Sequence, residues 1–177
     1  MKVGVVGAGA VGAATALSLI ERGGTCREIV LVDRAAERAA GVAVDMRYAA
    51  PLSPVVDVRA GDYRDLVDAA LVVITAGANE KAGGATDRAD TQGRLRLLDT
   101  NAKIYADIVP RIVSVAPQAV LMVVTDPPDP LADLTRHLAG HNRVFSTGNT
   151  HRQPALPRAP GRSAAGAPTG RAGDGGR

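Results

Sequence analysis

Apolar residues along this chain gather in six short runs, separated by longer stretches in which polar and small residues are mixed. The runs lie at residues 2–6, 29–32, 55–58, 71–75, 120–124 and 143–146. The fourth run, Leu71-Val72-Val73-Ile74-Thr75, is rich in β-branched residues, which is typical of a strand buried on both faces of a parallel sheet. We predict six strands at these positions.

The stretches between the runs predict helices at residues 13–20, 35–48, 63–70, 94–115 and 130–139, with a kink or break at Pro110. Residues 79–93 are polar and contain glycine, which predicts a long mobile loop. Strands that alternate with helices in this way predict one α/β domain built on a doubly wound parallel sheet. Ligands of such a sheet bind at the carboxyl ends of its strands.

The chemistry expected at that edge begins with Gly7-Ala8-Gly9-Ala10-Val11-Gly12, where the first run passes into a helix. In the pattern G-x-G-x-x-G, the first glycine permits a tight turn and the second lets the backbone approach a pyrophosphate. The third lets helix and strand pack closely. The helix N-terminus adds free N–H groups and the positive end of a dipole. A glycine turn that binds nothing is the alternative.

Asp33 supports the first interpretation. It follows the second run, 21 residues after Gly12, where an acid accepts hydrogen bonds from ribose hydroxyls and repels a 2′-phosphate. The two signals together predict a Rossmann-type sheet that binds NAD in preference to NADP. Arg34, the next residue, favours a 2′-phosphate instead and leaves NADP as the alternative.

The charge distribution excludes one class of function. Of the 21 basic and 18 acidic residues, five Arg and one Asp lie in residues 149–177, which leaves 16 basic and 17 acidic residues before them. The body of the chain therefore has no basic patch on which to argue nucleic-acid binding. A single cysteine, Cys26, rules out an internal disulfide. The sequence also shows no signal peptide and no apolar run long enough to span a membrane. Together with the single cysteine, this predicts a cytoplasmic protein that contacts no membrane. We expect no metal site.

These residues together resemble the NAD-dependent lactate/malate dehydrogenase family across residues 1–148. The matching segments are the glycine turn, Asp33, Thr75-Ala76-Gly77-Ala78-Asn79, Arg94-Leu95 with Asn101, and Thr125-Asp126-Pro127-Pro128-Asp129. The resemblance implies NAD as the cofactor and a hydride transfer that interconverts a 2-hydroxy acid and its 2-oxo acid. It also implies a small-molecule partner and, as is usual in the family, a homo-oligomer.

The resemblance implies a role for each matched residue. Arg94 matches the arginine on the closing loop that polarises the substrate carbonyl, which makes it the candidate catalytic residue. Glu80, Arg94, Asp126 and Asp129 match positions near the substrate. The positions that match cofactor contacts are Gly7, Gly9, Val11, Gly12, Asp33, Arg38, Tyr63, Gly77, Ala78, Asn101, Val124, Thr125, Asp126 and Thr147.

Three departures from the family pattern affect the substrate. The segment from Asn79 to Arg94 is longer than usual, which changes how the loop closes. Glu80 stands where lactate enzymes have Gln and malate enzymes have Arg, and its charge repels a second carboxylate. We therefore expect an L-lactate-like substrate rather than malate. Asp126 replaces the usual Asn, and an ionised Asp only accepts hydrogen bonds, which leaves other 2-oxo acids open.

The resemblance implies two further groups, which the family carries after the part matched here. One is an Asp-x-x-Arg motif whose arginine binds the substrate carboxylate, and the other is a histidine that acts as general acid/base. We expect neither in this chain, and therefore a domain truncated before the catalytic α+β domain. His137 and His141 are expected at the surface, and His151 lies in the tail.

Residues 149–177 contain four Pro, six Gly and five Arg without periodicity, which predicts a disordered tail. Removing one base from the Asn149 codon of a G/C-rich back-translation permits Gly-Thr-His-Ile-Asp-Ser-Pro-Arg-Phe-Arg, which resembles the family's continuation. We therefore expect the tail to be a frame-shifted translation and the chain alone to be inactive. The alternatives are a non-catalytic NAD-binding module and a product that does not fold.

Overall fold

Six strands form one sheet in which every neighbouring pair is parallel, in the order β3-β2-β1-β4-β5-β6. The computed structural model describes residues 1–49, 56–81 and 90–148, so predictions on the tail and on residues 82–89 lie outside it. The strands are β1 (Lys2–Val6), β2 (Glu28–Val32), β3 (Asp57–Ala60), β4 (Ala69–Ile74), β5 (Val120–Val123) and β6 (Val144–Ser146). The predicted doubly wound α/β sheet is confirmed.

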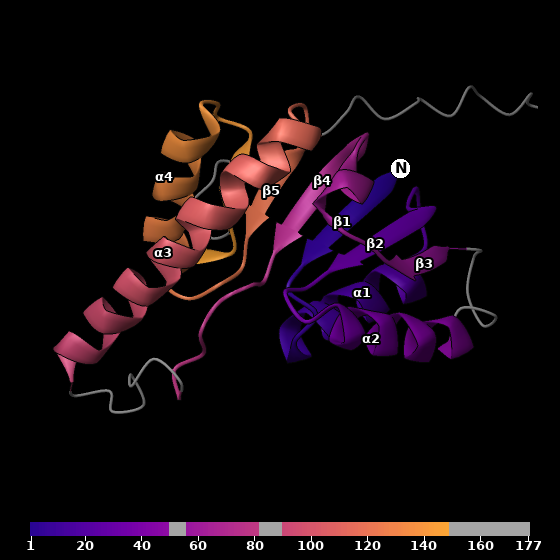
Figure 1. Cartoon of the computed structure of the whole chain (residues 1–177), viewed down its shortest axis with the longest axis horizontal. Helices are drawn as coiled ribbons and strands as arrows, with labels where there is room; N and C mark the ends of the chain where they lie inside the picture. The colour runs from indigo at the N-terminus through magenta and orange to yellow at the C-terminus, as the bar shows by residue number, and fades with distance from the viewer. Residues whose placement is uncertain (50–55, 82–89, 149–177) are drawn as a thin grey trace, which may run out of the picture.

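Helices cover both faces of this sheet. The helices α1 (Ala10–Arg22) and α2 (Ala36–Ala49) pack on one face, and α3 (Thr91–Val115) and α4 (Pro128–Ala139) pack on the other (Figure 1). The chain leaves β1 toward β2 and β3, and then crosses to β4 on the other side of β1. The strand order therefore reverses between β1 and β4, which is where a doubly wound sheet opens a crevice for ligands.

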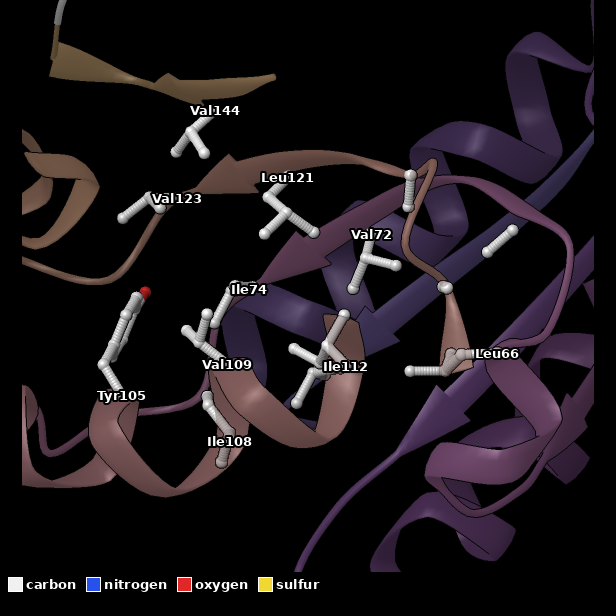
Figure 2. Close-up of a cluster of buried hydrophobic side chains, with 14 of the residues drawn as sticks. Leu66, Val72, Ile74, Tyr105, Ile108, Val109, Ile112, Leu121, Val123 and Val144 are labelled. Carbon is white, nitrogen blue, oxygen red and sulfur yellow. The ribbon is translucent and has the colours of Figure 1, made fainter. Parts of the chain in front are cut away.

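Two clusters of buried aliphatic side chains hold the layers together. Figure 2 shows the cluster under α3, in which Ile108, Val109 and Ile112 meet Val72 and Ile74 of β4. The cluster under α1 and α2 includes Val5 and Leu31 of neighbouring strands and Ile20 of α1. Since the chain has only four Phe and Tyr residues, branched aliphatic residues supply most of this core.

One ring does enter the core. Tyr105 of α3 is fully buried, and its hydroxyl lies beside Thr125 with no hydrogen bond of ordinary geometry among the described residues. Burial raises the pKa of this hydroxyl, and Thr125 opposes the shift by a smaller amount. Tyr105 therefore stays neutral and acts as a core residue.

Several element boundaries differ from the predictions. The helix predicted at 63–70 is wrong beyond Leu66, because η2 (Tyr63–Leu66) ends there and Asp68 adopts a φ of 61° before β4 begins. The helix α3 begins at Thr91 rather than Arg94, since the Asp90 side chain accepts a hydrogen bond from the Gln92 N–H group at 2.9 Å and caps it. It also continues through Pro110 without a break.

The remaining helices agree with the predictions to within a few residues, and α4 begins at Pro128 rather than Pro130. Pro128 occupies the first helical turn, where a proline loses no hydrogen bond. In the described parts of the chain, no helix is both long and apolar enough to cross a bilayer.

The cluster under α3 yields a stability prediction. Ile112→Ala removes a fully buried side chain and leaves a cavity, so we expect the free energy of unfolding to fall by about 2–5 kcal/mol. Leu95→Ala, on the same helix but 58% exposed, serves as the control and is expected to change it by at most about 0.5 kcal/mol. Urea denaturation of both variants measures the difference. Equal effects of the two substitutions would contradict the packing described here.

Candidate functional site

The turn between β1 and α1 needs glycine at two positions for lack of space. Gly7 has a φ of 107°, and a Cβ atom there would lie 2.5 Å from the Ala76 backbone nitrogen. A Cβ atom on Gly12 would lie 1.9 Å from the Gly7 carbonyl oxygen. Gly9 is different, because a Cβ atom there would meet no atom of residues 1–49, 56–81 and 90–148 within 4 Å. The backbone at Gly9 therefore faces open space.

The same turn is the start of a helix that lacks a side-chain cap. Gly9 is the N-cap of α1, no side chain in the described part of the chain accepts a capping hydrogen bond at this end, and the first turn carries no acid. The first N–H groups of α1 are thus available to an anion in the open space next to Gly9.

Hydrogen bonds brace the glycine turn from two sides. The Thr75 hydroxyl, at the end of β4, donates to the Gly7 carbonyl at 2.7 Å. The half-buried Asp33, at the end of β2, accepts the Ala8 N–H group at 2.8 Å through Oδ2 and the Ala35 N–H group at 2.9 Å through Oδ1. Each carboxylate oxygen keeps a further lone pair for another donor. This bracing by Asp33 was not foreseen from the sequence.

A cavity of about 260 Å³ lies on the other side of the glycine turn, at the carboxyl ends of β4 and β5. Figure 1 shows the arrowheads of β1 and β4 pointing to this edge. The cavity is lined by Val11, Thr75, Gly77, Ala78, Asn79, Glu80, Val124, Thr125 and Asp126. A larger hollow of about 550 Å³ follows the outer face of α1 and shares only Val11 with it. The cavity at the strand ends, with its carboxylates and hydroxyls, is the candidate site.

Asn101 of α3 clamps the two loops that form the walls of the cavity. Its side chain is fully buried, accepts the Ala78 N–H group at 2.7 Å, and donates to the Ala78 carbonyl at 3.2 Å. It also donates to the Asp126 carbonyl at 2.8 Å. Thr125 adds a hydrogen bond to the Ala76 carbonyl at 2.9 Å. The loops after β4 and β5 are thus tied to each other and to α3.

These features fit an extended dinucleotide along one edge of the sheet. Asp33 offers carboxylate oxygens on the β2 side, and Gly9 with the first turn of α1 offers N–H groups at the centre. The cavity offers a partly enclosed space on the β4–β5 side. Residues 1–146 match the sequence model of the lactate/malate dehydrogenase NAD-binding domain.

The chain belongs to the lactate/malate dehydrogenase family. NAD is the cofactor of the matched domain. The chain is 43% identical to L-lactate dehydrogenase of Chloroherpeton thalassium over 152 residues, which cover 85% of this chain and 47% of that enzyme. It is 45% identical to the enzyme of the same name from Deinococcus radiodurans over 148 residues, which cover 84% of this chain and 46% of that enzyme. The chain thus spans a little under half the length of these curated relatives.

Solved structures show the same family. Minor L-lactate dehydrogenase from Enterococcus mundtii superposes with a TM-score of 0.73 at 35% identity, over 84% of this chain and 46% of that one. Malate dehydrogenase from Archaeoglobus fulgidus in complex with NADH gives a TM-score of 0.70 at 35% identity, over 82% of this chain and 48% of that one.

The structure brings some of the residues predicted from the family resemblance to the cavity and leaves others elsewhere. Those that line it are Val11, Gly77, Ala78, Glu80, Val124, Thr125 and Asp126. Asn101 lies behind its wall, and Arg38 is exposed on α2. Thr75 and Asn79 also line the cavity; the resemblance assigns neither a role, although both stand in the segment that follows β4.

Tyr63 lies beneath α3. The Arg111 guanidinium stacks on its ring, 4.0 Å from the ring centre, and the ring packs against the core cluster under α3. Burial raises the pKa of the Tyr63 hydroxyl, and the positive charge of Arg111 partly offsets this.

Three other predicted residues lie at the ends of β6, α3 and α4. Asp129, in the first turn of α4, forms a short hydrogen bond with the Ser146 hydroxyl, and the exposed Thr147 donates its N–H group to the Val123 carbonyl at 3.1 Å. Arg94 lies in the first turns of α3, and its side chain is outside what the structure describes.

Asp133-Leu134-Thr135-Arg136 has the spacing of an Asp-x-x-Arg motif, although it lies within the matched domain and not after it. Within α4 its two charged residues form an ion pair with each other, and Arg136 also donates to the Val144 carbonyl at the start of β6. These two residues therefore stabilise the packing of α4 against the amino end of β6, away from the cavity at the carboxyl ends of the strands.

The clamp yields a second prediction. Asn101→Ala removes three hydrogen bonds and leaves partly buried backbone groups of Ala78 and Asp126 without this partner, so we expect the free energy of unfolding to fall by about 1–3 kcal/mol. Thr100→Ala, at the exposed neighbouring position, is the control and is expected to change it by at most about 0.5 kcal/mol. Guanidinium denaturation compares the two. A loss no larger than that of the control would refute the clamp.

Proposed function

We propose that this chain is the cofactor-binding part of an enzyme that transfers a hydride between NAD and a 2-hydroxy or 2-oxo acid. When bound, the nicotinamide ring supplies or takes up that hydride. The observation that carries the proposal is the alignment of Asp33, the open backbone at Gly9 and the cavity along one edge of the sheet. Membership of the lactate/malate dehydrogenase family supports it.

In this proposal the chain binds the cofactor in three sections. Asp33 accepts hydrogen bonds from the adenosine ribose hydroxyls. Gly9 and the N–H groups at the start of α1 hold the pyrophosphate, since no described residue occupies the space where a Gly9 side chain would stand. Val11, Gly77, Ala78, Val124 and Thr125 enclose the nicotinamide end in the cavity. Gly7 and Gly12 shape the turn, while Asn101 positions two of the walls.

In the same proposal the substrate binds beside the nicotinamide end in this cavity, whose lining includes Glu80 and Asp126. The proposed role of Arg94 is to polarise the substrate carbonyl, because a guanidinium stabilises charge that develops on that oxygen. The Glu80 carboxylate repels a second carboxylate on the substrate, which favours an L-lactate-like acid over malate. The names of the curated relatives agree with this choice.

Arg38, Tyr63, Thr147 and Asp129 remain proposed contacts that rest on the resemblance alone. Assembly into a homo-oligomer, as is usual in the family, is part of the same proposal.

The proposal predicts that the 177-residue chain binds NAD more tightly than NADP in a calorimetric titration. Asp33→Asn removes the charge that repels a 2′-phosphate, so we expect the ratio of NADP affinity to NAD affinity to rise by roughly tenfold. Asp45→Asn, exposed near the far end of α2, removes the same charge and is expected to leave the ratio unchanged. NADP binding equal to NAD binding by the unmodified chain would count against the assigned role of Asp33.

A turnover assay tests the catalytic part. We expect the 177-residue chain to bind NADH without reducing pyruvate at a useful rate, since a positioned general acid/base contributes about 10²–10⁴-fold. Among the described residues, His137 lies in the last turn of α4 and His141 precedes β6. Both therefore lie toward the amino ends of the strands, whereas the cavity lies at the carboxyl ends. His141 accepts the Arg143 N–H group at 3.2 Å, and burial, aided by the charge of Arg143, lowers its pKa. Steady-state reduction at about 1 s⁻¹ or faster would show that this expectation is wrong.

A further inference from the structure

The candidate cavity carries two negative charges. Glu80 follows β4 and Asp126 follows β5, and both line the cavity. The other described residues of the lining are apolar or uncharged, and no ion pair joins either carboxylate to another described residue. Both residues are exposed, and each carboxylate contributes a negative potential to this part of the cavity.

One of these charges stands on a backbone that is held in place. The Asp126 carbonyl accepts the Asn101 side-chain N–H at 2.8 Å, and Thr125 just before it is hydrogen bonded to the Ala76 carbonyl. A Cβ atom on Gly77, opposite Thr125, would lie 2.3 Å from the Thr125 methyl group, so the walls are already in close contact. The backbone that carries the Asp126 carboxylate is thus fixed before any ligand arrives.

The order of the sites along the sheet assigns one end of the cofactor to this cavity. Asp33 follows β2 and the glycine turn follows β1, while the cavity lies at β4 and β5. A dinucleotide whose adenosine ribose lies at Asp33 and whose pyrophosphate lies at the glycine turn must extend its nicotinamide end toward the cavity. This step rests on the function proposed above.

The two redox forms of the cofactor differ in charge only at that end. The nicotinamide ring is a cation in NAD⁺ and is neutral in NADH, while the ADP-ribose portion is the same. We propose that Asp126, assisted by Glu80, makes this cavity select the oxidised cofactor by attracting the cationic ring. Asp126 is thus a determinant of cofactor redox state as well as a wall of the site.

The test compares three ligands on the full chain at low ionic strength, where charges are least screened. NAD⁺, NADH and ADP-ribose are titrated calorimetrically into the unmodified chain and into Asp126→Asn. Because Asn has nearly the same shape without the charge, we expect the affinity for NAD⁺ relative to NADH to fall by about three- to tenfold. The affinity for ADP-ribose, which lacks the ring, is expected to stay the same.

Two further variants sharpen the result. Glu80→Gln is expected to shift the ratio in the same direction by a smaller factor. Asp57→Asn removes one charge from the exposed start of β3, the outermost strand on the side of the sheet away from β4 and β5. We expect it to leave the ratio of NAD⁺ affinity to NADH affinity unchanged. Raising the salt concentration is expected to narrow the difference between the unmodified chain and Asp126→Asn.

The outcomes separate this inference from the proposed function. ADP-ribose and NADH binding with an unchanged ratio in Asp126→Asn overturns the inference and leaves the cofactor site standing. An equal loss of affinity for all three ligands assigns Asp126 a structural role and also overturns it. Failure of the unmodified chain to bind any of the three overturns the proposed function and the inference with it.

Discussion

The close approach of Gly12 to the carbonyl oxygen of Gly7 is the constraint on which the site depends. No side chain fits between them, so α1 begins directly beside the end of β1. The same carbonyl accepts the Thr75 hydroxyl from β4, and Asp33 at the end of β2 holds the Ala8 N–H group. The ends of three neighbouring strands therefore meet at one turn of six residues, and the position of each depends on the others.

The wall of the cavity is built by a different means. Buried polar side chains, Asn101 and Thr125, replace the missing backbone pairing where β4 and β5 end and their loops diverge. A buried amide that satisfies several backbone groups also excludes alternative loop positions, because each would leave a donor or acceptor without a partner. The backbone position of the cavity walls is thereby defined before a ligand binds.

The fold followed from the sequence because its strands are buried and its glycine turn has a characteristic spacing. Continuous apolar runs such as 71–75 have few other interpretations in a chain with alternating helices. The boundaries depended on single residues that periodicity does not reveal. Val67 leaves the helical conformation and ends η2, and Asp68 follows with a positive φ. Asp90 starts α3 three residues early by capping it.

The candidate site was predictable only in part. Residues next to strand ends, such as Gly77 and Thr125, could be placed by topology, and the cavity contains them. The contacts of Asn101, and the contact of Asp33 with Ala8, join residues more than 20 positions apart, so no local pattern indicates them. Conversely, Asp133 and Arg136 have the spacing of a substrate-binding motif but lie in a surface ion pair of α4. The spacing of a motif therefore indicates a substrate-binding role only where the fold also brings its residues to the site at the carboxyl ends of the strands.

The hydrogen bonds of Asn101 have one more consequence. Among the described residues, its hydrogen-bond partners are backbone atoms of Ala78 and Asp126, and none is a side chain. Substitution at either partner position therefore leaves the frame of the cavity intact while it changes what the cavity presents to a ligand. The residue that holds the cavity walls and the side chains that contact a ligand can therefore be substituted independently. A change of ligand preference, in evolution or in protein engineering, does not require a change in the hydrogen bonds that hold the walls.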